Sequence, residues 1–498
     1  MTDSALSGAA ARRAARNASA IAIAQIISKG ALYVWQILLA QLISTTAYGI
    51  YGTVTAHLQI GAVVTAFGLA NIVIRDVARQ RSLAGQYMSS ALVIQTVGAL
   101  IAYVGIFIAS AAYPLDVRAF IALAGLSLFI DMLGNLCYDQ LQAQERMVTT
   151  AAVEIGHIAL RIALALLALT AGYGLLGVYI ATLISGVARA GLLWATVLRN
   201  EVRPEFPLER GRLRGMLRDA APLALGAFIG VFGYSADRLL AGRLLGLEQV
   251  AYLNASFVII VGMVELLNTT VLIAGYPLLS RAYTPEGDLS LYHMMVNKLA
   301  FFTLVIVLPI TLGVSIFAEQ LALIFGADFL PAAAVLRWMV WYALLAMLAA
   351  VYAQALLVQN RQRLTLVIRV AGLGVNLVLL VFLLPRVGIV GAAVASIIGE
   401  SLMLALLYAA FLQDRRARHS PSRVVRVIVA GIAGALTMMM LGQLHFILGA
   451  VGGVSVYIVT GLALRTLAPD DWALLRRLVE AMPGGTVLLR GLPMPPSS

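Results

Sequence analysis

The sequence predicts an all-α integral membrane protein with about 14 transmembrane helices: two six-helix lobes related as parallel repeats, followed by two C-terminal helices. Three observations support this fold class: the composition, the charges of the loops and an internal repeat. Of the 498 residues, 61% are hydrophobic and 12% are charged, and the mean hydropathy is +0.93. A soluble domain carries about one quarter charged residues. The composition therefore indicates a chain that is surrounded largely by lipid.

Apolar stretches of about 20 residues, each long enough for one membrane crossing, recur along the whole chain. The first is longer than the apolar core of a secretory signal and no A-x-A cleavage site follows it, so we expect it to remain as a helix. The predicted spans are 17–44, 47–74, 83–111, 118–142, 150–171, 174–198, 217–242, 248–277, 290–317, 331–356, 364–384, 388–412, 424–443 and 445–467.

Most connections between the predicted spans are short, and only two are long and basic, near 199–218 and 413–426. They divide the chain into blocks of six, six and two helices. We therefore expect an N-terminal lobe, a basic cytoplasmic linker, a C-terminal lobe, a second basic cytoplasmic linker, helices 13 and 14, and a cytoplasmic amphipathic tail. In that order, the boundaries are 1–198, 199–216, 217–412, 413–423, 424–467 and 468–498.

The basic residues are distributed unequally between the two sides of the membrane. With the N-terminus inside, the loops and tails on that side hold 25 of the 35 Lys and Arg residues. The opposite side holds only Arg118, Arg243 and Arg386, and the rest lie within the spans. Cytoplasmic loops carry the excess of Lys and Arg in membrane proteins, and an error in the helix count would have mixed the two sets. We therefore expect an even number of helices and cytoplasmic termini.

An internal repeat relates the sixth span to the twelfth. The sixth opens with GLLGVYIATLISG at 174–186, and the twelfth opens with GIVGAAVASIIGE at 388–400, 214 residues later. At the same offset Tyr138 aligns with Tyr352. Since six helices is an even number, both copies enter the membrane in the same direction, which makes them parallel repeats about an axis along the membrane normal. We expect two six-helix lobes that face each other across a central space.

Several spans carry polar residues that lipid would disfavour. An Arg or Asp at the middle of a helix costs about 2.5–3.5 kcal/mol to insert, so such residues normally face a bundle interior or a water-filled cavity. Glu154, His157 and Arg161 are spaced by three and four and share one helical face, as do Asp131 and Asn135. Other polar residues within spans include Lys29, Arg189, Asp237, Arg238, Glu265, Arg369 and Glu400.

Two explanations of these charges stay open. In one, acids and bases pair and brace the helices against one another. In the other, which we favour, a polar cavity with a positive wall attracts an anionic headgroup. Lys29, Arg161 and Arg189 supply cations in the first six helices, where deeply placed acids are few. A planar guanidinium can bind two phosphate oxygens at once, so arginine suits a phosphate ligand.

Other chemistry finds little support in the sequence. The single cysteine, Cys137, cannot form an intrachain disulfide, and no Cys/His cluster has metal-ligand spacing. GYGLLG at 172–177 fits a dinucleotide-binding pattern but joins two predicted transmembrane helices and follows no strand. The basic residues lie in short loops rather than in a continuous stripe, so we expect no nucleic-acid partner. We likewise expect no catalytic residue, no metal ligand and no cofactor.

Three segments carry a resemblance to a known family. QILLAQLISTTAYGIYGTVTA at 36–56, FGLANIVIRDVARQ at 67–80 and GYSADRLLAGRLLG at 233–246, together with the repeated helices, resemble the Wzx-type polysaccharide flippases of the multidrug/oligosaccharidyl-lipid/polysaccharide exporter superfamily. The resemblance implies a transporter rather than an enzyme. It would move a polyprenyl-phosphate-linked oligosaccharide from the cytoplasmic to the outer leaflet by alternating access, in the plasma (inner) membrane of a prokaryote.

The resemblance also implies roles for individual residues and partners. Besides the lipid-linked oligosaccharide and the bilayer, it implies polysaccharide-assembly proteins as partners, and we expect a monomer. The implied cationic cavity consists of Lys29, Arg161, Arg189 and Arg369. From the residues themselves we expect further polar cavity residues, of which the acids are candidates for coupling to a Na⁺ or H⁺ gradient: Asp131, Asn135, Glu154, His157, Asp237, Arg238, Glu265 and Glu400.

Two other functions stay open. A drug or organic-cation antiporter of the same superfamily should need an acidic cavity in the first lobe, whereas that lobe has an excess of cations. A membrane polysaccharide polymerase or ligase usually presents a sizeable outer loop with acids, His or Arg, whereas every predicted outer connection here is short. The flippase is therefore the favoured hypothesis.

Overall fold

The computed structural model describes residues 27–200, 202–284, 289–412, 421–468 and 471. Within these ranges every regular element is a helix, and thirteen helical segments are long and apolar enough to cross a membrane. They correspond to the second to fourteenth predicted spans and confirm the predicted fold class. The first predicted span, 17–44, lies partly outside the described residues, and its described part is helical over 27–42.

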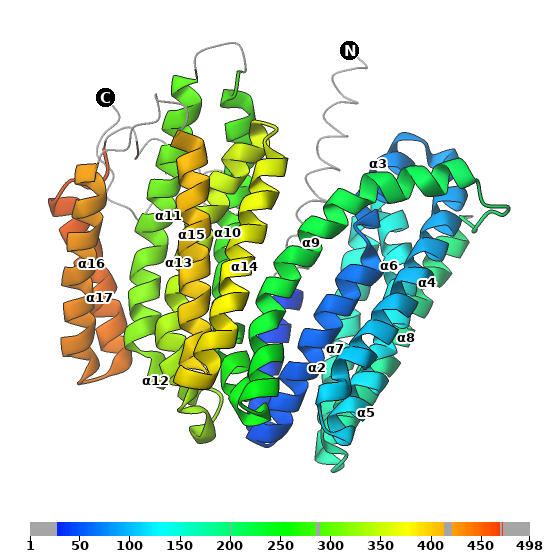
Figure 1. The fold of residues 1–498 in the computed structure, drawn as a ribbon, viewed down its shortest axis with the longest axis horizontal. Coiled ribbons are helices and arrows are strands. Elements are labelled where there is room, and N and C mark those ends of the chain that lie inside the picture. Colours follow the sequence, from blue (N-terminus) through cyan, green and yellow to red (C-terminus); the bar gives the residue numbers. More distant parts are fainter. Residues whose placement is uncertain (1–26, 201, 285–288, 413–420, 469–470, 472–498) are drawn as a thin grey trace. The chain divides into compact units, whose positions relative to one another are not determined.

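The chain forms two compact units, Met1–Val258 and Ile259–Ser498, whose helices are labelled in Figure 1. The boundary between the units falls within α10, and the predicted lobe and linker boundaries stay a prediction. The elements of the first unit are α2 (Thr45–Ala66), α3 (Leu69–Arg79), η1 (Arg81–Leu83), α4 (Ala84–Ala109), η2 (Ser110–Ala112), α5 (Leu115–Gly125), α6 (Ser127–Ala143), α7 (Met147–Thr170), α8 (Gly174–Arg199), α9 (Arg210–Leu244) and the first part of α10 (Leu247–Ala282).

The second unit contains the rest of α10 and the helices that follow it. They are α11 (Ser290–Ile316), α12 (Ala318–Leu323), η3 (Ala327–Phe329), α13 (Ala332–Val358), α14 (Gln362–Val387), α15 (Val390–Leu412), α16 (Pro421–Gly442) and α17 (Phe446–Ala463). Helices α16 and α17 form a hairpin, and α16 also packs against α11.

The second predicted span is one crossing with a break in it. Ser44 caps α2 by accepting a hydrogen bond from the Ala47 backbone N–H at 3.2 Å, as N-cap serines do. Helix α2 ends where Phe67 and Gly68 both adopt positive φ angles, 46° and 67°. Glycine takes such a conformation without steric cost, and it commonly ends helices there. Helix α3 then continues to the basic loop.

Helix packing follows the same scheme in the two copies of the repeat. In the first unit, α8 packs against α6 and α7, and in the second unit α15 packs against α13 and α14. Helices α8 and α15 carry the two repeated glycine motifs that the sequence aligns. The predicted repeat is therefore consistent with the packing within each unit.

Candidate functional site

Three neighbouring helices of the first unit bring a set of predicted site residues together around Arg189. The Arg189 Nε of α8 donates to Glu154 Oε1 of α7 at 2.7 Å, and its Nη2 donates to Asn135 Oδ1 of α6 at 2.9 Å. The Arg189 side chain is 9% exposed, and that of Glu154 is 23% exposed. Arg189 is thus neutralised by an acid, as the bracing explanation expects for a buried cation.

A small residue in α6 leaves room for the Arg189 guanidinium. Gly134 lies in α6 directly before Asn135, and a Cβ placed on it would come within 2.5 Å of the Arg189 Nη1. The guanidinium can therefore lie close to the backbone of α6 while it reaches α7. Glycine at a helix interface allows this kind of close approach.

Arg161 differs from Arg189. It lies two turns after Glu154 on α7. Glu154, His157 and Arg161 are all half-buried, so the rest of the protein covers the predicted polar face only in part. Within the described part of the chain Arg161 forms no ion pair, and its Nε is buried without a hydrogen-bond partner. The half-buried Asp131 lies within electrostatic reach of both arginines. A cation with unsatisfied donors therefore stands beside a neutralised pair.

A second polar group lies on α14 and α15. The Asn376 Nδ2 donates to Ser396 Oγ at 3.1 Å. Glu400 is half-buried, and its Oε1 has no hydrogen-bond partner among the described residues. Arg369 is exposed and lies within electrostatic reach of Glu400. The structure thus places two predicted residues, Arg369 and Glu400, near each other.

Asp237 and Arg238 lie in the interior of the first unit, with exposures of 2% and 5%. Arg238 donates to Gln59 Oε1 of α2 at 2.6 Å and to Asn254 Oδ1 of α10 at 3.2 Å. Its guanidinium also lies 5.3 Å from the centre of the Phe257 ring, a cation–π arrangement. In this conformation Arg238 joins α9 to α2 and α10, and neither residue forms an accessible wall.

The end of α9 is bonded to the end of α4 and to Tyr113, which directly follows η2. The Tyr113 hydroxyl donates to the Leu239 carbonyl at 2.9 Å, and the Arg243 Nη2 donates to the Ala109 carbonyl at 2.6 Å. Burial raises the pKa of Tyr113 to about 12, so the hydroxyl keeps its proton at neutral pH. This end of the unit, which the loop charges predict to be the outer end, is closed by direct hydrogen bonds.

The remaining predicted residues lie elsewhere. Lys29 is exposed on the helix over 27–42, and Glu265 is half-buried on α10. Their predicted roles, like those of the other site residues, stay predictions. Within the described residues, no group of three or more His, Cys, Asp or Glu side chains could hold a metal ion.

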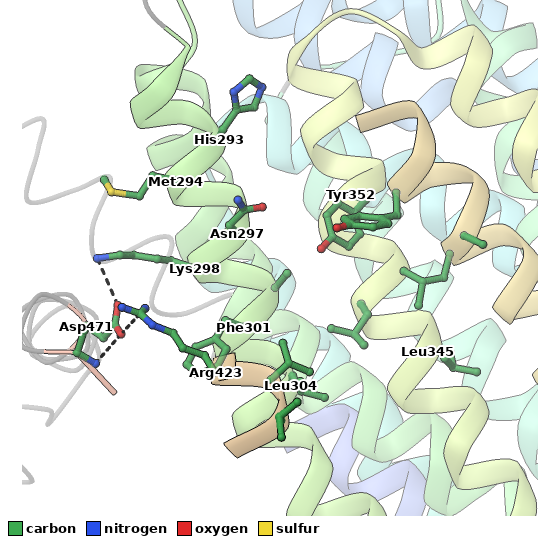
Figure 2. Close-up of a pocket in the computed structure, with 18 of the residues that line it drawn as sticks. His293, Met294, Asn297, Lys298, Phe301, Leu304, Leu345, Tyr352, Arg423 and Asp471 are labelled. Carbon is green, nitrogen blue, oxygen red and sulfur yellow. Dashed lines mark hydrogen bonds and ion pairs between the residues drawn. The ribbon is translucent and has the colours of Figure 1, made fainter. Parts of the chain in front are cut away.

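Sequence reasoning missed a cavity of about 1010 Å³ in the second unit, lined by α11, α13, α15 and α16. Figure 2 shows Lys298 of α11 and Arg423 of α16 reaching Asp471. The Lys298 Nζ lies 3.3 Å from Asp471 Oδ1, and the Arg423 Nη1 lies 3.3 Å from Asp471 Oδ2. Lys298 is separated from Asp471 by more than 170 positions, so only the fold could reveal the contact. The rest of the predicted amphipathic tail lies almost entirely outside the described residues.

The chain is similar to several solved transporters. It superposes on the lipid II flippase MurJ in an inward closed conformation with a TM-score of 0.76 and 12% identity, over 89% of this chain and 98% of that one. An inward-facing multidrug resistance MATE family transporter of the MOP superfamily gives a TM-score of 0.61 and 17% identity, over 80% and 97%. A MOP superfamily transporter from Pyrococcus furiosus gives 0.53 and 16%, over 80% and 94%. Because all three identities are low, these superpositions show a shared fold and no more.

The family follows from the sequence match. A comparison with curated proteins gave no match. The family model described as polysaccharide biosynthesis protein matches residues 14–283, which is more than half of the chain, and confirms the family resemblance that the sequence motifs carry. The chain belongs to the polysaccharide biosynthesis protein family.

Proposed function

We propose that the protein is a flippase that moves a polyprenyl-phosphate-linked oligosaccharide from the cytoplasmic to the outer leaflet by alternating access. The observation that carries the proposal is Arg161. It is a half-buried cation in an apolar span, and it has no ion-pair partner in the described part of the chain. An unpaired arginine at this depth normally faces a polar pathway rather than lipid.

The chemistry of arginine fits the phosphate of such a carrier lipid. Its planar guanidinium can form two parallel hydrogen bonds to phosphate oxygens. A sugar headgroup would otherwise have to cross hydrocarbon, where each unsatisfied polar group costs several kcal/mol. In this account the phosphate binds Arg161, the sugars lie against polar side chains of α6 and α7, and the polyprenyl tail stays in lipid.

The neighbouring ion pair of Arg189 and Glu154 contributes to substrate binding by fixing the side chains beside Arg161. Glu154 neutralises Arg189, and Asn135 orients it. Because Glu154 is already engaged, it competes less with the phosphate for Arg161. On this polar face of the described helices α6 to α8, Arg161 is thus the cation available to an anionic ligand. The Arg189–Glu154 pair beside it is already fixed in place before a ligand binds.

Alternating access requires the outer end to open. The bonds from Arg243 to Ala109 and from Tyr113 to Leu239 hold α9 against the end of α4 and the segment that follows it. We propose that these bonds form in the state that receives substrate from the cytoplasm and break in the state that releases it.

Asp131 and Glu400 are the acids we propose for coupling to a Na⁺ or H⁺ gradient. Each is half-buried in a membrane span, and no hydrogen bond or ion pair engages either one within the described ranges. Intramembrane acids of this kind often serve as ion or proton sites. The membrane potential acting on an anionic cargo is the alternative driving force.

We further propose a prokaryotic inner-membrane location with both termini cytoplasmic, a monomeric protein, and polysaccharide-assembly proteins as partners. The second candidate function is a drug or organic-cation antiporter, since the multidrug resistance transporter above has the same fold. Asp131, which no ion pair engages within the described ranges, would then hold the cation. A polymerase or ligase is the third and weakest candidate.

The test is reconstitution of the full chain into proteoliposomes that contain fluorescent lipid-linked oligosaccharides. A membrane-impermeant quencher reports which leaflet the label occupies. We expect leaflet exchange of polyprenyl-phosphate sugars, and no uptake of an organic cation such as ethidium. The assay is run with and without Na⁺ and pH gradients to identify the driving force.

A matched set of cargoes makes the outcome specific. The same fluorophore on a phosphate-free polyprenyl sugar should exchange much more slowly, because it gives Arg161 no anion to bind. Exchange of ethidium without exchange of any sugar lipid would favour the antiporter and overturn the proposal.

A further inference from the structure

The cavity of the second unit carries a carboxylate between two cations. Lys298 and Arg423 each contact one oxygen of Asp471 at 3.3 Å. The Asp471 side chain is 1% exposed, while those of Lys298 and Arg423 are 18% and 38% exposed. Asp471 Oδ2 also accepts a hydrogen bond from the Ala468 backbone N–H at 2.8 Å. The carboxylate thus fills a position that two cations surround.

Most of the remaining cavity wall is apolar, although Ser290, His293, Asn297 and Ser401 also line it. Phe301 and Leu304 follow Lys298 along α11, and Leu348 of α13 and Leu404 of α15 also line the cavity. Figure 2 shows the charged side chains at one side of the view, with Phe301, Leu304 and Leu345 beyond them. A cavity with a cationic end and mostly apolar walls matches a molecule with an anionic head and a hydrocarbon chain.

The position along the helices indicates which leaflet the cationic end would face. Lys298 lies in the third turn of α11 and Arg423 in the first turn of α16. Both helices follow connections that the loop charges predict to be cytoplasmic. Basic pockets between transmembrane helices on that side bind anionic lipid headgroups.

We propose that this cavity binds an anionic phospholipid of the inner leaflet. Its phosphate takes the place of the Asp471 carboxylate between Lys298 and Arg423, and one acyl chain lies along Phe301 and Leu304. The site is separate from the α6–α8 cluster of the proposed function, and the bound lipid is a resident of the membrane rather than the transported cargo.

The geometry favours exchange of one anion for the other. Strong charge-assisted N–H···O contacts measure about 2.7–2.9 Å, whereas both cations lie 3.3 Å from Asp471. A phosphate offers more oxygens than a carboxylate and can accept both hydrogen bonds of the arginine fork. When the lipid binds, Asp471 leaves the two cations, and its hold on α11 and α16 is released.

The experiment uses the purified full chain in a neutral detergent. Its thermal stability is measured while dioleoylphosphatidylglycerol, dioleoylphosphatidylcholine or inorganic phosphate is added. We expect stabilisation by phosphatidylglycerol at lower concentration than by phosphatidylcholine. Lys298→Gln and Arg423→Gln should each raise the half-saturating concentration of phosphatidylglycerol about fivefold, which corresponds to one cation near a lipid surface.

The decisive variant is Asp471→Asn. It removes the competing charge, so we expect half-saturation at about fivefold lower phosphatidylglycerol. Arg337→Gln is the matched control, since Arg337 pairs with Glu319 in the same unit outside this cavity, and it should not change the half-saturating concentration. Leu348→Trp fills the apolar part without touching the charges, and it should weaken the binding of phosphatidylglycerol.

Several outcomes would overturn the proposal. If the three charged residues serve only to hold the chain together, Asp471→Asn will be less stable and will bind phosphatidylglycerol no better than the wild type. If phosphatidylglycerol and phosphatidylcholine half-saturate at the same concentration, the cavity does not recognise an anionic headgroup. If inorganic phosphate alone stabilises the protein fully, the cavity binds a phosphate group and not a lipid. If Asp471→Asn does not fold, the two cation variants and Leu348→Trp still decide.

Discussion

Arg161 and Arg189 lie in adjacent helices, yet they meet different surroundings. Arg189 is held by Glu154 and Asn135, whereas Arg161 has a buried Nε with no hydrogen-bond partner among the described residues. The cost of burying a charge is met in the first case by an ion pair and in the second by exposure of part of the side chain. A residue's function at this depth therefore depends on its partner more than on its type.

The ion pair predicts a stability effect. Arg189→Gln leaves Glu154 partly buried without its cation, so we expect the free energy of unfolding to fall by about 2 kcal/mol. The double variant Glu154→Gln/Arg189→Gln should recover part of the loss, because no charge is left unpaired. Thermal melting in detergent measures both. If the losses of the single variants Glu154→Gln and Arg189→Gln simply add in the double variant, the residues are not energetically coupled.

Spacing along one helix was predictable, and pairing between helices was not. The intervals of three and four place Glu154, His157 and Arg161 on one face of α7, as the structure shows. The contact between Glu154 and Arg189 joins positions 35 residues apart, and the sequence offered four further acids and several cations as partners. Only the packing of α6, α7 and α8 selects this pair.

At the scale of helices, the repeat keeps the packing and changes the chemistry. Helix α15 packs on α13 and α14 as α8 packs on α6 and α7. At the offset of 214 residues, Met403 stands where Arg189 stands and Ile368 where Glu154 stands. Ile368 belongs to a buried apolar cluster against which Met403 packs. Apolar packing in the second copy thus stands in place of the ion pair of the first.

The repeat explains which part of the site the sequence could predict. The glycine motifs of α8 and α15 were sufficient to predict that the two copies pack alike. They could not predict that the polar residues that meet in the second copy, Asn376 and Ser396, would lie at other positions of the repeat than Glu154 and Arg189. Side-chain chemistry varies between copies because packing requires only matched volume.

Helix α2 packs closely on the start of α10 at Gly49. A Cβ placed on Gly49 would lie 1.8 Å from the Leu247 carbonyl oxygen. Gly49→Ala should therefore force the helices apart and reduce the free energy of unfolding by about 1–3 kcal/mol. Thermal melting in detergent measures the change.

The control for this variant is Gly105→Ala in α4. A Cβ placed on Gly105 would have no neighbouring atom within 4 Å, so alanine should be neutral or should stabilise by about 0.5–1 kcal/mol. If both variants melt at the wild-type temperature, α2 and α10 do not approach as closely as the structure shows.

At the scale of the whole molecule, composition and loop charge predicted most of the fold. Thirteen spans match because a bilayer accepts only long apolar helices for this kind of chain, and their lengths can be read from hydropathy. The cavity with Lys298, Arg423 and Asp471 could not be predicted, because its lining comes from four helices and a segment distant in sequence.

The orientation of the molecule is testable with single cysteines. Cys137 is fully buried, so the native thiol should not react with a membrane-impermeant maleimide. Arg386 and Arg146 are both exposed and lie in loops predicted to be outer and inner. We expect Arg386→Cys to be labelled in intact cells, and Arg146→Cys to be labelled only after the membrane is opened. The reverse pattern would invert the proposed topology.

The central claim is that Arg161 binds the phosphate of a sugar-carrying lipid during transport. Leaflet exchange of a fluorescent polyprenyl-phosphate oligosaccharide in proteoliposomes tests it most directly. Arg161→Ala should insert and melt like the wild type, because it breaks no hydrogen bond or ion pair within the described residues, but it should lose most of the exchange, and Arg161→Lys should keep only part of it. Exchange at the wild-type rate by Arg161→Ala would contradict the claim.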